Sequence, residues 1–151
     1  MSRDDPDMTS PLAPQQLICD LTQSWSDVGG GVGTYLRHKR RHILDRTPHR
    51  HLLIVPGPED TVTEEGRAIT ATIRSPRVPG SPHYRLMLRN GAVRDLLERF
   101  RPDLIECQDS YNLAWAALGH RKRFPETALV GGYFTDFPTV YVERPFSKVM
   151  G

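Results

Sequence analysis

The chain contains a glycine-rich segment, Asp27-Val28-Gly29-Gly30-Gly31-Val32-Gly33-Thr34-Tyr35-Leu36. An apolar run, Leu17–Leu21, precedes it, and a helical pattern that begins near Val32 follows it. A strand, a glycine loop and a helix start present backbone N–H groups that have no partner inside the helix. Together with the helix dipole, these groups form an anion site. We interpret the loop as facing the diphosphate of a nucleotide-linked ligand; a flexible connection without a ligand is the alternative.

Length and composition are those of one ordinary globular domain. The chain has 151 residues, of which 38% are hydrophobic and 25% are charged, which is compatible with a real core. The net charge of +2 is too small to indicate a nucleic-acid partner. The N-terminus is polar, without the apolar core of a signal peptide, and we therefore expect a cytoplasmic protein. Cys19 and Cys107 lie in apolar runs and are expected to be buried free thiols.

The pattern along the chain alternates between strands and helices. Residues 1–15 contain three prolines and no period, and are predicted to be a disordered lead-in to a domain over 16–151. Predicted strands cover 17–21, 51–55, 68–73, 104–107 and 128–133. Predicted helices cover 32–45, 90–100 and 111–120. Between them, 59–66 is predicted to be a polar connection and 75–84, with its prolines, a long loop.

This alternation predicts an α/β fold: a Rossmann-like parallel sheet flanked by helices, with right-handed crossovers. Ligands bind such sheets at the carboxyl ends of the strands, near the point where the strand order reverses. Four features are expected to converge on that edge: the glycine loop, the turn at 56–58, Asp109, and the turn at 133–138.

The glycine spacing excludes two common nucleotide motifs. Counted from Gly29, the third position of the dinucleotide pattern is Thr34; counted from Gly31, it is Leu36. The sequence also contains no Gly-Lys-Ser or Gly-Lys-Thr, so it has no P-loop. A nicotinamide enzyme is therefore disfavoured, and no cofactor is expected.

The first predicted helix carries a histidine pair and a basic cluster. His38 and His42 lie four residues apart, a spacing that suits a metal. Four cations surround them and would repel one: Arg37, Lys39, Arg40 and Arg41. We therefore expect no metal site. The four cations are interpreted either as a solvated basic face or as a contact for anionic lipid headgroups at a membrane surface.

Further polar candidates follow the predicted strands. Asp109 and Asp136 lie just past strand ends, where a carboxylate binds hydroxyls or acts as a base. The alternatives are a helix N-cap for Asp109 and a turn former for Asp136. Tyr84 and Arg85 close the proline-rich loop; Arg85 is interpreted either as a ligand for a phosphate or carboxylate or as a surface arginine.

Taken together, these stretches resemble the N-terminal domain of the family-four retaining glycosyltransferases of GT-B type. Four pieces match in order over about 16–145: Gly29-Gly30-Gly31-Val32; 75–79 with Tyr84 and Arg85; 101–105 leading to Asp109 and Tyr111; and 133–138 with Tyr141. Each piece is weak alone, whereas the ordered set is fairly specific.

The resemblance implies a glycosyltransferase that moves a sugar from a nucleotide-sugar donor to an acceptor hydroxyl, with retention. This chain would supply the acceptor-side half of the GT-B architecture, for a glycan or lipid-linked acceptor. The resemblance places the glycine loop, Gly29 to Val32, against the donor diphosphate. It implies an acceptor side formed by Tyr84, Arg85, Asp109, Tyr111, Phe134 and Asp136, with Asp136 or Asp109 as candidate catalytic groups.

Two departures limit what the resemblance implies. Phe134 stands where many relatives carry a histidine, and a phenyl ring neither binds a sugar hydroxyl nor transfers a proton. The chain also ends at Gly151, so the C-terminal donor-binding domain is missing and we expect a fragment that is inactive alone. The alternative function is a non-catalytic nucleotide- or sugar-binding module. A flavodoxin-like regulator is disfavoured because only Asp20 supplies an acidic group at the first strand.

Overall fold

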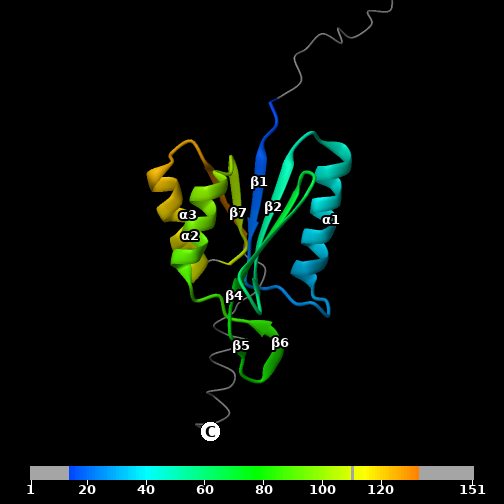
Figure 1. The fold of residues 1–151 in the computed structure, drawn as a ribbon, viewed down its shortest axis with the longest axis vertical. Helices are drawn as coiled ribbons and strands as arrows, with labels where there is room; N and C mark the ends of the chain where they lie inside the picture. The colour runs from blue at the N-terminus through cyan, green and yellow to red at the C-terminus, as the bar shows by residue number, and fades with distance from the viewer. Residues whose placement is uncertain (1–13, 110, 133–151) are drawn as a thin grey trace, which may run out of the picture.

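A computed structural model describes residues 14–109 and 111–132. A six-stranded sheet forms the middle layer, with α1 on one face and α2 and α3 on the other (Figure 1). The helices are α1 (Gly31–Arg46), α2 (Asn90–Phe100) and α3 (Asn112–Arg123). The strands of this sheet are β1 (Leu17–Leu21), β2 (Arg50–Gly57), β3 (Thr61–Glu65), β4 (Ala68–Arg74), β7 (Leu104–Cys107) and β8 (Ala128–Gly131).

The strand order is β3-β4-β2-β1-β7-β8, and every neighbouring pair except β3·β4 is parallel. From the central strand β1 the chain builds β2 and β4 on one side, and then crosses to β7 and β8 on the other. The loops after β1 and β7 therefore leave the sheet where the strand order reverses. This arrangement confirms the predicted Rossmann-like α/β fold.

The larger apolar core lies between the sheet and the pair α2 and α3. It takes every second residue of the central strands, including Cys19, Leu52 and Ile105. A smaller cluster of Leu36, Leu53 and Val55 packs beneath α1. Because β2 is buried on both faces, its sequence is a continuous apolar run rather than an alternating one.

Both cysteines are free and buried, as expected. Burial raises the pKa of the Cys19 thiol well above its ordinary value. The pKa of Cys107 is raised to about 11, again mainly by burial. Both side chains are therefore neutral packing groups at ordinary pH.

Two predicted connections contain strands. The polar segment 59–66 includes β3, an antiparallel edge strand that turns into β4 at Gly66. The predicted loop over 75–84 includes a hairpin of β5 (Arg77–Val78) and β6 (Ser81–Arg85). Its turn is Pro79-Gly80, where proline presets one backbone angle and Gly80 takes a φ of 77°. Proline and charged residues are typical of edge strands as well as of loops. Composition alone therefore did not distinguish edge strands from loops in these two segments.

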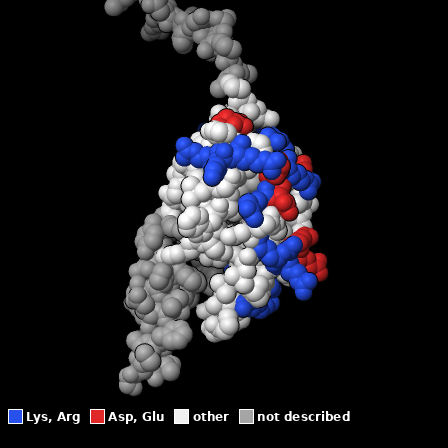
Figure 2. All heavy atoms as spheres, turned by 90° about the vertical axis from the view of Figure 1, so that its left-hand side faces the viewer, with Lys and Arg blue, Asp and Glu red and all other residues white. Residues whose placement is uncertain are grey.

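The other elements lie close to their predicted ranges. Helix α2 has the predicted bounds, and α1 is one residue longer at each end. Helix α3 begins at Asn112 and continues through Arg121-Lys122-Arg123, its basic last turn. In Figure 2, Lys and Arg side chains gather along the upper rim of the α2 and α3 face, above a broad uncharged surface. No helix in the described part of the chain is long and apolar enough to cross a membrane.

Candidate functional site

The carboxyl ends of the parallel strands bring distant segments of the chain to one edge of the sheet. The loop after β1 ends in the glycine stretch at the start of α1. The connection after β2, the end of β4 with the β5–β6 hairpin, and the segment after β7 reach the same end of the sheet (Figure 1). The predicted turn at 133–138, with Phe134 and Asp136, lies outside the described residues.

Asp109 fixes the loop that follows β1. One carboxylate oxygen accepts hydrogen bonds from the Thr22 hydroxyl at 2.8 Å and from the Gln23 backbone N–H at 2.6 Å. The other accepts one from the Ser24 hydroxyl at 3.0 Å. The side chain is buried, and both of its oxygens are therefore committed inside the fold. Asp109 is a positioning residue at the point where the strand order reverses; its catalytic role stays a prediction.

The helix-cap interpretation of Asp109 is wrong. The N-cap of α3 is Tyr111, another expected acceptor-side residue, and no side chain caps this helix. The reason is local: the Asp109 carboxylate is bonded to the β1 loop across the sheet instead. Tyr111 itself is half-buried.

The glycine loop leaves the start of α1 open. Gly29 and Gly30 have φ angles of 120° and 127°, which L side chains rarely adopt. Gly30 is the N-cap; no side chain caps α1, and its first turn carries no acidic residue. The N-terminal N–H groups and the positive end of the helix dipole are therefore unopposed by a side chain of this chain. Such an end suits an anion.

Tyr84 connects the β5–β6 hairpin to the glycine loop. Its hydroxyl lies 3.1 Å from the position that a Cβ at Gly30 would occupy. By contrast, a Cβ at Gly29 or Gly31 would meet no atom within 4 Å. The structure thus brings the predicted diphosphate-facing loop and the predicted acceptor-side residues Tyr84 and Arg85 together.

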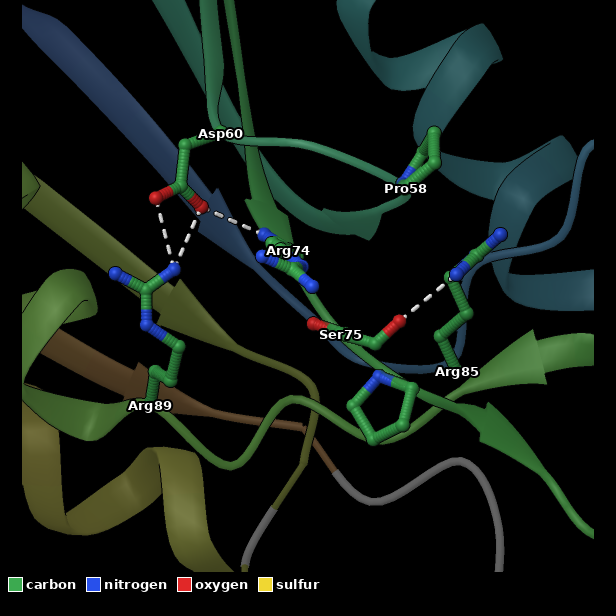
Figure 3. Close-up of a pocket in the computed structure, with 7 residues that line it drawn as sticks. Pro58, Asp60, Arg74, Ser75, Arg85 and Arg89 are labelled. Atoms are coloured by element: carbon green, nitrogen blue, oxygen red, sulfur yellow. Dashed lines mark hydrogen bonds and ion pairs between the residues drawn. The ribbon is translucent and has the colours of Figure 1, made fainter.

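A cavity of about 610 Å³ opens beside Arg85 at the same edge (Figure 3). Its lining residues come from β2–β3, β4, β6 and the start of α2: Pro58, Asp60, Arg74, Ser75, Pro76, Arg85 and Arg89. Arg85 donates to the Ser75 carbonyl oxygen at 2.8 Å. Both oxygens of Asp60 accept from one nitrogen of Arg89 at 2.8 Å, and one also accepts from the Arg74 backbone N–H at 2.7 Å.

These contacts set the charge state of the cavity. The hydrogen bond from the Arg74 backbone, followed by that from Arg89, lowers the pKa of Asp60, so its carboxylate is ionised at neutral pH. Sequence reasoning missed Asp60, Arg74 and Arg89. The available signal was the position of Asp60 two residues after Pro58, in the turn that was expected at this edge.

A buried polar layer attaches α1 to the sheet. Asp20 is fully buried and contacts Lys39 at 2.8 Å, His51 Nε2 at 2.6 Å and Gln108 Nε2 at 2.7 Å. Lys39 also pairs with Glu106, which lies opposite Asp20 in the β1·β7 pairing. The layer spans three adjacent strands beneath one helix.

The solvated-face interpretation is wrong for two of the four α1 cations. Lys39 is directed inward to Asp20 and Glu106. Arg40 donates to His51 Nδ1 at 2.8 Å, to the Thr70 hydroxyl at 2.7 Å and to the Ile69 carbonyl oxygen at 2.5 Å. The physical reason is that buried Asp20 and His51 require polar partners. Arg37 and Arg41 remain exposed, and the Arg37 guanidinium stacks over Trp25 at 4.8 Å.

The polar layer has defined protonation states. Burial alone would raise the pKa of Asp20, but the hydrogen bond from His51 and the charge of Lys39 outweigh it and lower that pKa. Burial lowers the pKa of His51 despite Asp20. Because His51 Nδ1 accepts from Arg40, its proton lies on Nε2 and is donated to Asp20. Neutral His51 thus bridges an arginine and an aspartate.

The described residues contain no group of three or more His, Cys, Asp or Glu side chains placed to hold a metal ion. His38 and His42 are both exposed on α1. The polar groups at the carboxyl edge include hydroxyls and guanidinium groups, which suit sugar hydroxyls and oxyanions, and the carboxylates of Asp60 and Asp109, both of which are bonded within the protein.

The sheet order and the three flanking helices define a Rossmann-like α/β domain. A family comparison identifies it further: the model of Glycosyltransferase Family 4 matches residues 29–149. The chain therefore belongs to glycosyltransferase family 4, and its sheet is consistent with one half of a GT-B protein. Searches of curated proteins and of solved structures found no match.

Proposed function

We propose that this chain forms the acceptor-side half of a retaining glycosyltransferase that uses a nucleotide-sugar donor. The observation that carries the proposal is the family match, which begins at Gly29 in the glycine loop. The open N-terminus of α1 supports it, because backbone N–H groups there suit a diphosphate.

In this proposal the diphosphate of the donor lies against the glycine loop. The charge that develops on the leaving diphosphate would be stabilised by the N–H groups at Gly31 to Gly33 and by the dipole of α1. Tyr84, beside Gly30, would lie between the donor and the acceptor. The opposite wall of the cleft, with most donor contacts, would come from a second domain.

Rigid placement of the loop is the contribution of this half. Asp109 anchors the segment between β1 and the glycines through three hydrogen bonds. Such fixed positioning of donor and acceptor lowers the entropic part of the barrier. Phe134 leaves the proton-transfer group unassigned, and we propose Asp136 for that role.

The test is release of nucleoside diphosphate by the full-length protein, measured over a panel of nucleotide sugars with and without candidate acceptors. We expect acceptor-dependent release with one donor. Retention is then read from the anomeric configuration of the product by NMR. Saturable donor binding without turnover across the panel would contradict catalysis and favour the non-catalytic binding module.

A further inference from the structure

The cavity in Figure 3 is lined mainly by charged side chains. Its charged lining residues are Asp60, Arg74, Arg85 and Arg89. Three cations and one anion give the lining a formal charge of +2. Arg74 lies in β4, Arg85 in β6 and Arg89 directly before α2. The fold brings these three arginines to one cavity, which their spacing along the sequence does not indicate.

Each arginine retains hydrogen-bond donors for a ligand. Arg85 uses one terminal nitrogen on the Ser75 carbonyl oxygen, and Arg89 uses one on Asp60. The Arg74 guanidinium makes no hydrogen bond or ion pair with the described residues; only its backbone N–H is engaged, by Asp60. A guanidinium carries five N–H donors in a planar fork that matches a phosphate.

Asp60 neutralises only one of the three cations. Like charges around one cavity repel one another, and a counter-charge of about two units is needed for balance. A carboxylate ligand supplies one unit. A phosphate monoester carries about −1.5 to −2 at neutral pH and offers three acceptor oxygens. The charge of the lining therefore fits a phosphate monoester better than a carboxylate.

We propose that this cavity binds a phosphate group on the acceptor, held by Arg74, Arg85 and the free donors of Arg89. The proposal rests on the proposed function, and it defines the acceptor class as an anionic, phosphorylated molecule. Arg85 follows Tyr84, which lies against Gly30. A phosphate in the cavity thus anchors one end of the acceptor, while its reactive hydroxyl extends past Tyr84 toward the glycine loop.

Asp60 acts as a selectivity group for this phosphate. It occupies one nitrogen of Arg89 and opposes any anion that enters. A doubly charged phosphate is attracted to Arg74 and Arg85 more strongly than a singly charged carboxylate is. It therefore overcomes the repulsion from Asp60 more readily. In Asp60→Asn, the side-chain oxygen still accepts from the Arg74 backbone while the negative charge is lost. This variant should bind inorganic phosphate more tightly and discriminate less against acetate.

Direct binding is the test, because it does not depend on turnover. Calorimetry on the full-length protein uses inorganic phosphate, glucose 6-phosphate and glucose as probes. We expect both phosphates to bind and glucose to bind far more weakly. Arg74→Gln should weaken phosphate binding by about tenfold, the loss of one charge-assisted contact. Arg121→Gln is the matched control, because Arg121 is exposed in the last turn of α3, away from the cavity.

A vesicle-binding experiment distinguishes the two sources of such a phosphate, a lipid headgroup and a soluble sugar phosphate. Phosphatidylcholine vesicles with phosphatidic acid are compared with vesicles of phosphatidylcholine alone. Association that requires phosphatidic acid and is lost in Arg74→Gln indicates a lipid headgroup. Binding of glucose 6-phosphate without vesicle association indicates a soluble sugar phosphate. Both outcomes support the site.

Two results overturn the proposal. One is equal weakening by Arg74→Gln and Arg121→Gln, because the effect would then be one of overall charge. The other is no phosphate binding by any arm. If no phosphate binds but donor turnover persists with a neutral acceptor, the site is wrong and the enzyme assignment stands. If phosphate binds as expected but no nucleoside diphosphate is released from any donor, the phosphate site stands and the assignment as an enzyme is wrong.

Discussion

Asp109 accepts hydrogen bonds on both carboxylate oxygens from the loop after β1. A purely catalytic carboxylate would contribute little to folding, whereas this one should contribute substantially. We expect Asp109→Ala to lower the free energy of unfolding by about 2–3 kcal/mol, since it leaves buried donors without acceptors. Asp109→Asn, which keeps one oxygen, should cost less. Urea denaturation measures both, and an unchanged midpoint in Asp109→Ala would contradict the positioning role.

His51 makes the fold sensitive to acid. Its pKa is lowered from 6.5, mainly by burial, so the unfolded chain binds a proton at this residue before the folded chain does. Stability therefore falls as pH drops below about 6.5. Protonation would also place a second N–H opposite the donor of Arg40. The lowered pKa of Asp20 adds stability above 3.8 that is lost in stronger acid.

A His51→Gln variant tests this dependence. Glutamine preserves a donor toward Asp20 but does not titrate. We expect the urea midpoint of the variant to change less between pH 7 and pH 5 than that of the wild type. The exposed His38 on α1 provides the control substitution His38→Gln, which should leave the pH profile of the wild type unchanged. Parallel pH profiles for wild type and His51→Gln would refute the assignment.

Helix α1 is held to the sheet by charges as well as by apolar contacts. Lys39 lies between Asp20 and Glu106, and Asp20 has no exposed surface. Lys39→Met keeps the apolar stem but leaves the buried carboxylate without its ammonium partner. We expect a loss of about 3 kcal/mol in unfolding free energy. Arg41→Met, on the exposed face of the same helix, should stay within about 0.5 kcal/mol; equal losses would contradict the inward orientation.

Helices and strands were predicted well where the spacing of apolar residues within the element itself defines it. The strand over 17–21 and helix α2 were predicted with their observed bounds, because apolar spacing alone defines them. Strand β3 was missed because Glu64 and Glu65 interrupt its β-branched start, although charge is typical of an edge strand. The β5–β6 hairpin was missed because Pro79 and Gly80 predict a turn without indicating that its flanks pair.

At the scale of the whole molecule, the sequence predicted that these loops meet at the carboxyl edge of the sheet, but not which residues contact one another there. Alternation fixed the sheet class, and the glycine loop, Tyr84, Arg85 and Asp109 do converge. The contact between Tyr84 and Gly30 joins residues far apart in the chain, and no spacing reveals it. The pairing of Lys39 and Arg40 with the sheet was likewise hidden, because a basic run on a helix usually indicates a solvated face.

The central claim is that the glycine loop faces the donor diphosphate. The direct test is the rate of nucleoside diphosphate release by the full-length protein carrying Gly30→Val. This change adds a side chain at a φ of 127° beside Tyr84. Gly66→Val is the control, because Gly66 also has a positive φ but lies in the β3–β4 turn at the opposite edge of the sheet. We predict at least a ~100-fold loss of kcat/KM for Gly30→Val, equivalent to about 3 kcal/mol, and near-normal kinetics for Gly66→Val. Unchanged kinetics in Gly30→Val would contradict the account.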